Sequence, residues 1–174
     1  MRSMAKPRGF SMTEMLVAVL VMGIGVLGVS ALQMVSLQNN RSALVRGEAV
    51  QLAYDLMDRI RANPLDGAPG VAYAGLSFGD PPPAAPDCVA RECSQREMVR
   101  FDQALWKCSL GGFEHDATCI AFRDSGVLPR FADQPGLPAG DGSVSVDAAG
   151  IVSITVRWLE PSDQWRSISV QSRG

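Results

Sequence analysis

The chain has 174 residues and a formal net charge of −2, from 16 basic and 18 acidic side chains. This length suits one domain with an appendage. The charge does not indicate nucleic-acid binding, because no basic stripe follows the N-terminal leader. The single histidine, His115, and the lack of a Gly-rich phosphate loop, a GxSxG motif or an HExxH motif argue against an enzyme or a cofactor site.

The first 40 residues combine a basic start with a long apolar run. Arg2, Lys6 and Arg8 come first, and Glu14 is the only acid in this part of the sequence. The predominantly apolar stretch from Met15 to Leu32 would be about 27 Å long as a helix, close to the roughly 30 Å of a hydrocarbon core. The preceding positive charge predicts a cytoplasmic N-terminus, with the rest of the chain across the membrane.

Two interpretations of this segment compete. A signal peptide would be cleaved near Val29-Ser30-Ala31 and lost, whereas a retained helix would be cut before the apolar run, at Gly9-Phe10. The helical pattern continues past Ala31 and stops only at Asn63-Pro64, because the residue before a proline is disfavoured in the α region. We therefore expect one helix of about 52 residues from Ser11 to Ala62, which favours retention. The apolar face of its second half comprises Leu37, Leu44, Ala49, Leu52, Ala53, Leu56, Met57 and Ile60.

Taken alone, Glu14 has two explanations. Ser11-Met12-Thr13-Glu14 has the S-x-x-E spacing of a capping box, which would place the acid at the favourable end of the helix dipole. Alternatively, Glu14 pairs with a cation of another chain, since a charge at the centre of a membrane helix costs about 2.5–3.5 kcal/mol and requires a partner.

The motif Gly9-Phe10-Ser11-Met12-Thr13-Glu14, after a basic leader and before an apolar helix, resembles the class III signal of type IV pilins. The segments ALQM, LMDRIRANP, FDQALWKC and LPAGDGSVSVD…ITVRWLE are similar to PilV-type minor pilins. The resemblance implies an α+β type IV pilin fold, with a long N-terminal helix packed on a small antiparallel sheet. It also implies that a prepilin peptidase cuts after Gly9 and methylates Phe10, and that Glu14 faces the N-terminus of a neighbouring subunit.

The same resemblance implies an organisation in four parts. Residues 1–9 would be the leader, 10–36 the transmembrane and filament-core half of the helix, 37–63 its amphipathic half, and 64–174 the head. The protein would sit in the bacterial inner membrane with its head in the periplasm and later reach the pilus and cell surface. Its partners would be other minor pilins, the major pilin and a tip adhesin, and it would contribute to adhesion and twitching motility.

Residues 64–92 are rich in proline, glycine and alanine, and we expect an exposed connector there. Ser94-Gln95-Arg96-Glu97 forms a second capping-box motif, which predicts a helix of about 14 residues ending at Lys107. Met98, Phe101, Leu105 and Trp106 of this helix are expected in the core.

The four cysteines, Cys88, Cys93, Cys108 and Cys119, favour disulfides in an oxidising compartment. The predicted helix would separate Cys93 from Cys108 by roughly 22 Å, which excludes this pair and with it Cys88–Cys119. Cys88–Cys108 would need a nearly taut return along the helix, so we favour Cys88–Cys93 and Cys108–Cys119. A zinc site that includes His115 is not expected, because the spacing C-x4-C…C-x10-C is not of the metal-binding type.

The pattern of alternating apolar residues in the C-terminal third predicts three strands, with turns at Asp147–Gly150 and Pro161–Asp163. The alternation of apolar residues predicts that one face of the sheet packs on the amphipathic half of the long helix and closes a single core. We expect Trp158 and Trp165 to be packing residues, and Ser153, Thr155 and Arg157 to lie on the opposite face.

The sequence thus predicts a minor pilin that helps to prime a type IV pilus and forms part of its tip complex. The nearest alternative is a minor pseudopilin of a type II secretion system. A DNA-binding pilin of a competence system is a weaker one, since Arg91, Arg96, Arg100 and Lys107 form only a modest basic group.

Overall fold

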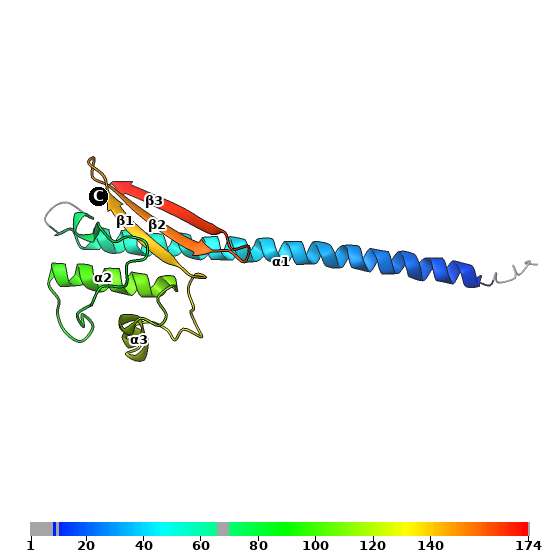
Figure 1. The fold of residues 1–174 in the computed structure, drawn as a ribbon, viewed down its shortest axis with the longest axis horizontal. Coiled ribbons are helices and arrows are strands. Elements are labelled where there is room, and N and C mark those ends of the chain that lie inside the picture. Colours follow the sequence, from blue (N-terminus) through cyan, green and yellow to red (C-terminus); the bar gives the residue numbers. More distant parts are fainter. Residues whose placement is uncertain (1–8, 10, 66–69, 174) are drawn as a thin grey trace, which may run out of the picture. The chain divides into compact units, whose positions relative to one another are not determined.

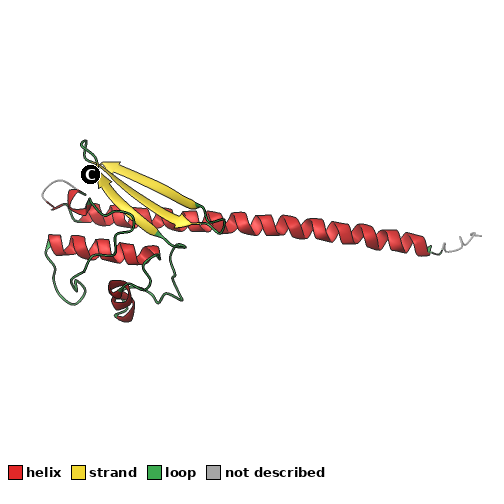
Figure 2. Ribbon diagram, viewed as in Figure 1, coloured by secondary structure: helices red, strands yellow, loops and turns green. Residues whose placement is uncertain are grey.

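A computed structural model describes residues 9, 11–65 and 70–173. Figures 1 and 2 show the long helix α1 (Met12–Ala62), the short 3-10 helix η2 (Val71–Tyr73), two further helices and three strands. Contacts divide the chain into two units, residues 1–42 and 43–174. The α+β architecture predicted from the sequence is confirmed.

Helix α1 spans 51 residues and ends directly before Asn63-Pro64, as predicted. Its buried residues all lie in the second unit: Ala49, Ala53, Leu56, Met57 and Ile60. Leu37 and Leu44, which the sequence assigns to the same apolar face, are 69% and 75% exposed. Helical periodicity identifies an apolar stripe, but the stripe is covered only where other elements lie against it.

The sheet consists of β1 (Asp141–Val146), β2 (Ile151–Leu159) and β3 (Trp165–Arg173), antiparallel in the order β1-β2-β3. The strands alternate between buried and more exposed positions, as period-two patterning requires. Val152, Ile154, Val156 and Trp158 face the core that they form with α1. The predicted strands and their packing on the long helix are therefore confirmed.

Trp165 does not follow the prediction. It lies three positions before Ile168, so the pleat places it on the opposite face from the partly buried Ile168 and Val170. Its side chain is 53% exposed, whereas Trp158 is 4% exposed in the core. The expectation that both tryptophans are packing residues is correct only for Trp158.

Helix α2 (Gln95–Leu110) lies alongside the second half of α1 (Figure 1), and the indole N–H of Trp106 donates to the carbonyl of Leu52 at 2.9 Å. The capping box of Ser94 and Glu97 is formed as predicted. The helix extends three residues beyond Lys107, so Cys108 lies within its last turn. It ends at Leu110 and is capped by Gly111, whose φ of 101° is favourable for glycine.

The connector is not uniformly exposed, which corrects the expectation for residues 64–92. Tyr73 is fully buried and Leu76 is 8% exposed, and both belong to the main core. The segment also pairs with β1, since the amide of Gly75 donates to Val144 O and the amide of Val144 donates to Leu76 O.

The head contains two apolar clusters, where the sequence predicted one. The second cluster joins α2 to the short helix α3 (Ala117–Asp124). Phe101 and Phe122 meet there edge to face, with ring centroids 5.5 Å apart. The buried members are Phe101, Ala104, Leu105, Cys108, Cys119 and Phe122, with Met98 partly buried against them.

Candidate processing and assembly site

The predicted processing site lies at the start of α1. Gly9 is exposed and precedes the helix, whereas Phe10 lies outside the described residues. The hydroxyl of Ser11 is 2.8 Å from that of Thr13, and the amide of Glu14 donates to the backbone carbonyl of Ser11. The first turn of α1 thus begins with this backbone bond.

Glu14 lies in the first turn of α1, and its side chain is exposed. Among the described residues, no basic side chain forms an ion pair with its carboxylate. A carboxylate at this position can therefore accept a cation from outside the chain, and it also lies at the favourable end of the helix dipole.

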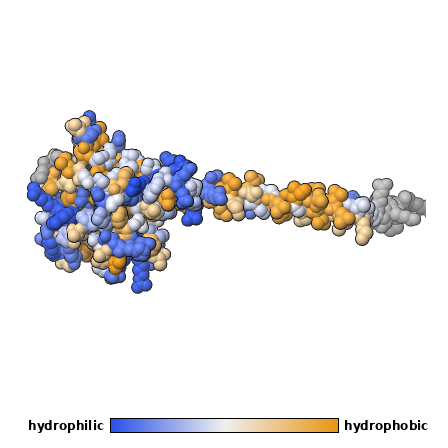
Figure 3. Space-filling view, viewed as in Figure 1, coloured by the Kyte–Doolittle hydropathy of each residue, from blue (hydrophilic) through white to orange (hydrophobic). Residues whose placement is uncertain are grey.

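The helix segment after Glu14 has no charged residue from Met15 to Asn40. Its most apolar 18-residue window has a mean hydropathy of 2.6 and is 0% buried, so α1 is long and apolar enough to cross a membrane. Figure 3 shows apolar side chains on the visible surface of this part of the helix. Each exposed Leu or Val here would gain roughly 1.5–3 kcal/mol on full transfer from water, which makes burial in lipid or among other helices strongly favourable.

A buried polar network fixes the end of α1 to α2. The Tyr73 hydroxyl donates to Asp102 Oδ2 at 2.7 Å, and Arg59 Nη1 donates to Asp102 Oδ1 at 3.2 Å. Asn63 donates to the Tyr73 hydroxyl and to Gln95 O. Burial raises the pKa of Tyr73, and the hydrogen bond to Asp102 raises it further.

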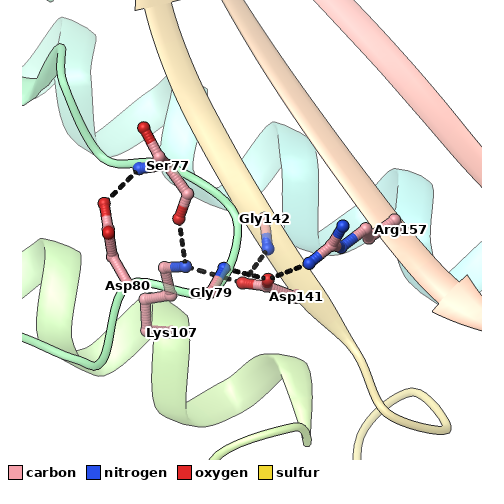
Figure 4. Close-up of polar contacts among 7 residues, drawn as sticks. All are labelled: Ser77, Gly79, Asp80, Lys107, Asp141, Gly142 and Arg157. Atoms are coloured by element: carbon pink, nitrogen blue, oxygen red, sulfur yellow. Dashed lines mark hydrogen bonds and ion pairs between the residues drawn. The ribbon is translucent and has the colours of Figure 1, made fainter.

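A second network connects α2, β1 and β2 through the carboxylate of Asp141 (Figure 4). Lys107 Nζ lies 2.6 Å from Asp141 Oδ1, and Arg157 Nη2 lies 2.9 Å from Oδ2. The amides of Gly79 and Gly142 donate to the same carboxylate, each at 2.7 Å. Burial alone would raise the pKa of Asp141, but the hydrogen bonds from Lys107 and Gly79 outweigh it and hold this pKa below its ordinary value.

The cysteines form Cys88–Cys93 and Cys108–Cys119, the pairing that the sequence favours. Among the described residues there is no free cysteine and no group of His, Cys, Asp and Glu side chains that could hold a metal. His115 is 93% exposed at its side chain, beside Glu114.

Neither polar network can be predicted from the sequence. The sequence suggests that Lys107 belongs to a basic group on the surface, but its side chain has no exposed surface. One signal exists in the sequence: Lys107 lies between Trp106 and Cys108, and it is the only lysine after Lys6. The role of Asp102 and Tyr73 has no such signal, since they are 29 positions apart in the sequence.

Comparison with known protein families supports the class that fold and sequence indicate. The model of the prokaryotic N-terminal methylation motif matches residues 4–30, and the model of type IV pilin Tt1218 matches residues 31–104. No curated protein and no solved structure matches the chain.

The two matches adjoin each other, and the second continues from α1 into α2. Together with the long apolar helix and the antiparallel sheet, they identify the chain as a type IV pilin-like protein. It is a pilin subunit with an N-methylation motif, an apolar N-terminal helix and disulfides, and its family is structural.

Proposed function

We propose that this pilin subunit is a minor pilin that helps to prime a type IV pilus and forms part of the complex at its tip. The observation that carries the proposal is the exposed apolar half of α1, which directly follows the methylation motif and has Glu14 in its first turn. A helix of this kind can be held first in the inner membrane and later among the helices of other subunits, because both surroundings are apolar.

Processing prepares the helix for this transfer. Cleavage between Gly9 and Phe10 by a prepilin peptidase removes the basic leader and creates a new ammonium group, which is then N-methylated. In the filament, the Glu14 carboxylate of one subunit meets the N-terminal ammonium of its neighbour. The pair offsets the desolvation of both charges, and it sets the axial register because an unpaired buried charge is costly.

The remaining parts of the chain have separate roles. Residues 10–36 form the membrane and filament-core segment, 37–63 the amphipathic half of the helix, and 64–174 the head that recognises other subunits. The head is periplasmic before assembly and reaches the cell surface in the pilus. Its partners are the major pilin, other minor pilins and a tip adhesin, with consequences for adhesion and twitching motility.

The minor, tip-associated role rests on the similarity of several segments to PilV-type pilins, among them FDQALWKC and LPAGDGSVSVD. In the structure these segments supply the buried Lys107 and Asp141 and the glycines around them. A minor pseudopilin of a type II secretion system would share the processing and the helix, and it is the second candidate.

The processing step is tested by replacing Gly9 with leucine in the full chain. The expected result is a retained precursor, detected by the mass of the intact protein, because the residue before the cut must be small. Ala5→Leu, in the same leader, is the matched control and should be processed normally. Normal processing of Gly9→Leu would contradict the assigned site.

The charge pair is tested with Glu14→Ala and Glu14→Asp. Both should be processed, but Glu14→Ala should be depleted from sheared pili, whereas Glu14→Asp should retain part of the incorporation. Equal incorporation of Glu14→Ala and the wild type would leave Glu14 with a helix-terminal role only.

Deletion of the gene separates the two candidate systems. Loss of surface pili with intact secretion of enzymes supports the pilus. Intact pili with lost secretion supports the pseudopilin.

A further inference from the structure

Two exposed aromatic side chains of the head enclose an arginine. The guanidinium carbon of Arg157 lies 4.2 Å from the ring centroid of Phe78 and 4.8 Å from that of Trp165. Phe78 is 37% exposed and Trp165 is 53% exposed. The three residues come from the loop after η2, from β2 and from the start of β3, so only the tertiary structure brings them together.

The Phe78–Arg157–Trp165 stack is connected to the Asp141 network through Arg157. Arg157 Nη2 is bonded to Asp141, whose carboxylate also accepts from Lys107 and from two backbone amides (Figure 4). The guanidinium is thus held between the two rings before any partner arrives. A partner would lose little additional side-chain entropy by binding there.

Arg157 is the cation that this site presents at the surface, because Lys107 is fully buried against Asp141. Asp141 is also the only hydrogen-bond partner of the Arg157 guanidinium among the described residues, although this group has five N–H donors. Its side chain is 32% exposed, so a further acceptor can reach it. A carboxylate is the acceptor that complements this charge and geometry.

The neighbouring outer face of the sheet suits contact with a protein. Ser143, Thr155 and Ser169 are aligned across the three strands, and Thr155 donates to Ser169 at 3.2 Å. These side chains are small and uncharged, so a partner can approach closely without desolvating an ion. Trp and Arg are also the residue types most enriched at the energetic centres of protein interfaces.

We propose that the Phe78–Arg157–Trp165 stack, with the adjoining hydroxyl-lined face, binds another pilin-like subunit that presents an acidic side chain next to an apolar one. This inference rests on the proposed function, since it names the head surface through which the subunit recognises a neighbour. The single exposed guanidinium and the small hydroxyl side chains beside it favour a single carboxylate over a polyanion such as nucleic acid.

The test uses the full chain in cells that assemble pili, with a photo-cross-linking amino acid at position 165. The expected result is an adduct with another pilin-like subunit, in which the cross-linked peptide contains Asp or Glu. The matched control is the same amino acid at Ile120, an apolar residue of α3 that is 45% exposed. No adduct at 165, an adduct equal to that at 120, or an adduct with lipid or glycan alone would overturn the proposal.

A substitution gives an independent measurement. Trp165→Ala should lower the unfolding midpoint only slightly, because its side chain is half exposed and loses one contact with Arg157. It should reduce incorporation into sheared pili by about tenfold, as expected for an interface centre. Ile120→Ala should change neither quantity. Normal incorporation of Trp165→Ala overturns this inference alone, whereas absence of the wild-type chain from pili overturns the proposed function together with it.

Discussion

The ammonium of Lys107 lies 2.6 Å from a carboxylate oxygen of Asp141, and the two side chains are 0% and 7% exposed. This ion pair joins the last turns of α2 to the first residue of β1 and lies within the segments by which the sequence resembles minor pilins. Two glycines next to this ion pair permit close packing around it. Gly142 leaves room for Trp106, and Gly140 allows the backbone to approach Leu110.

Asp141→Asn should destabilise the head by about 3–5 kcal/mol, because it leaves the Lys107 ammonium buried without a carboxylate. Lys107→Met should cost less, since Asp141 retains Arg157 and two amide donors. Urea unfolding of the full chain in detergent, with the disulfides intact, measures both. An Asp141→Asn variant as stable as the wild type would show that the pair makes no net contribution.

Replacing Cys108 and Cys119 together with serine should destabilise the head by more than the loss of Cys88–Cys93. The chain-entropy contribution of either disulfide is about 2–3 kcal/mol. Cys108 and Cys119 are also buried at the centre of the second cluster, at 1% and 0% exposure. Trypsin should then cleave faster at Arg123 and Arg130, which can be read from the mass of the fragments. If trypsin cleaves both double variants at the same rate, the deeper burial of Cys108 and Cys119 does not add to the stability of the head.

Acid should weaken the start of α2. The hydrogen bond from Arg91, followed by those from Ser94, lowers the pKa of Glu97 to about 2 from 4.5. A carboxyl group with a lowered folded pKa contributes stability above its unfolded pKa and loses it as the pH falls toward its folded pKa. The contribution of Glu97 is therefore lost between about pH 4.5 and pH 2, and Asp141 acts in the same direction.

Glu97→Gln tests this origin, since glutamine keeps the capping geometry but does not titrate. Its unfolding midpoint should fall less than that of the wild type between about pH 4.5 and pH 2, the range between the unfolded and the folded pKa of Glu97. Glu92→Gln, which removes an exposed carboxylate from the same loop, should show the full decrease. If both variants follow the wild type, the acid sensitivity has another source.

Gly142→Ala should destabilise the head by about 1–3 kcal/mol, because the added Cβ would overlap the buried indole ring of Trp106. Gly47→Ala is the matched control within α1, where an added Cβ meets nothing within 4 Å. This change should stabilise the helix by about 0.5–1 kcal/mol. Thermal unfolding followed by circular dichroism compares the two variants, and a tolerated Gly142→Ala would mean that Trp106 can move.

Local patterns in the sequence determine much of this protein by themselves. The basic leader, Gly9-Phe10 and the lone Glu14 indicate a pilin-like N-terminus, and helical and strand periodicity places α1 and the three strands. The length of α2 limits how the cysteines can pair. These features depend on residues close together in the sequence or on the geometry of a single element, so the sequence contains them directly.

Only the tertiary structure decides where long-range partners meet. Whether Leu44 is covered, whether Lys107 is buried and whether Trp165 stacks on Arg157 all depend on which segments lie against each element. Lys107 is 34 positions from Asp141, and Tyr73 is 29 positions from Asp102. Charge and hydropathy alone mark such side chains as surface residues, because the low free energy of the buried pair appears only when both partners are in place.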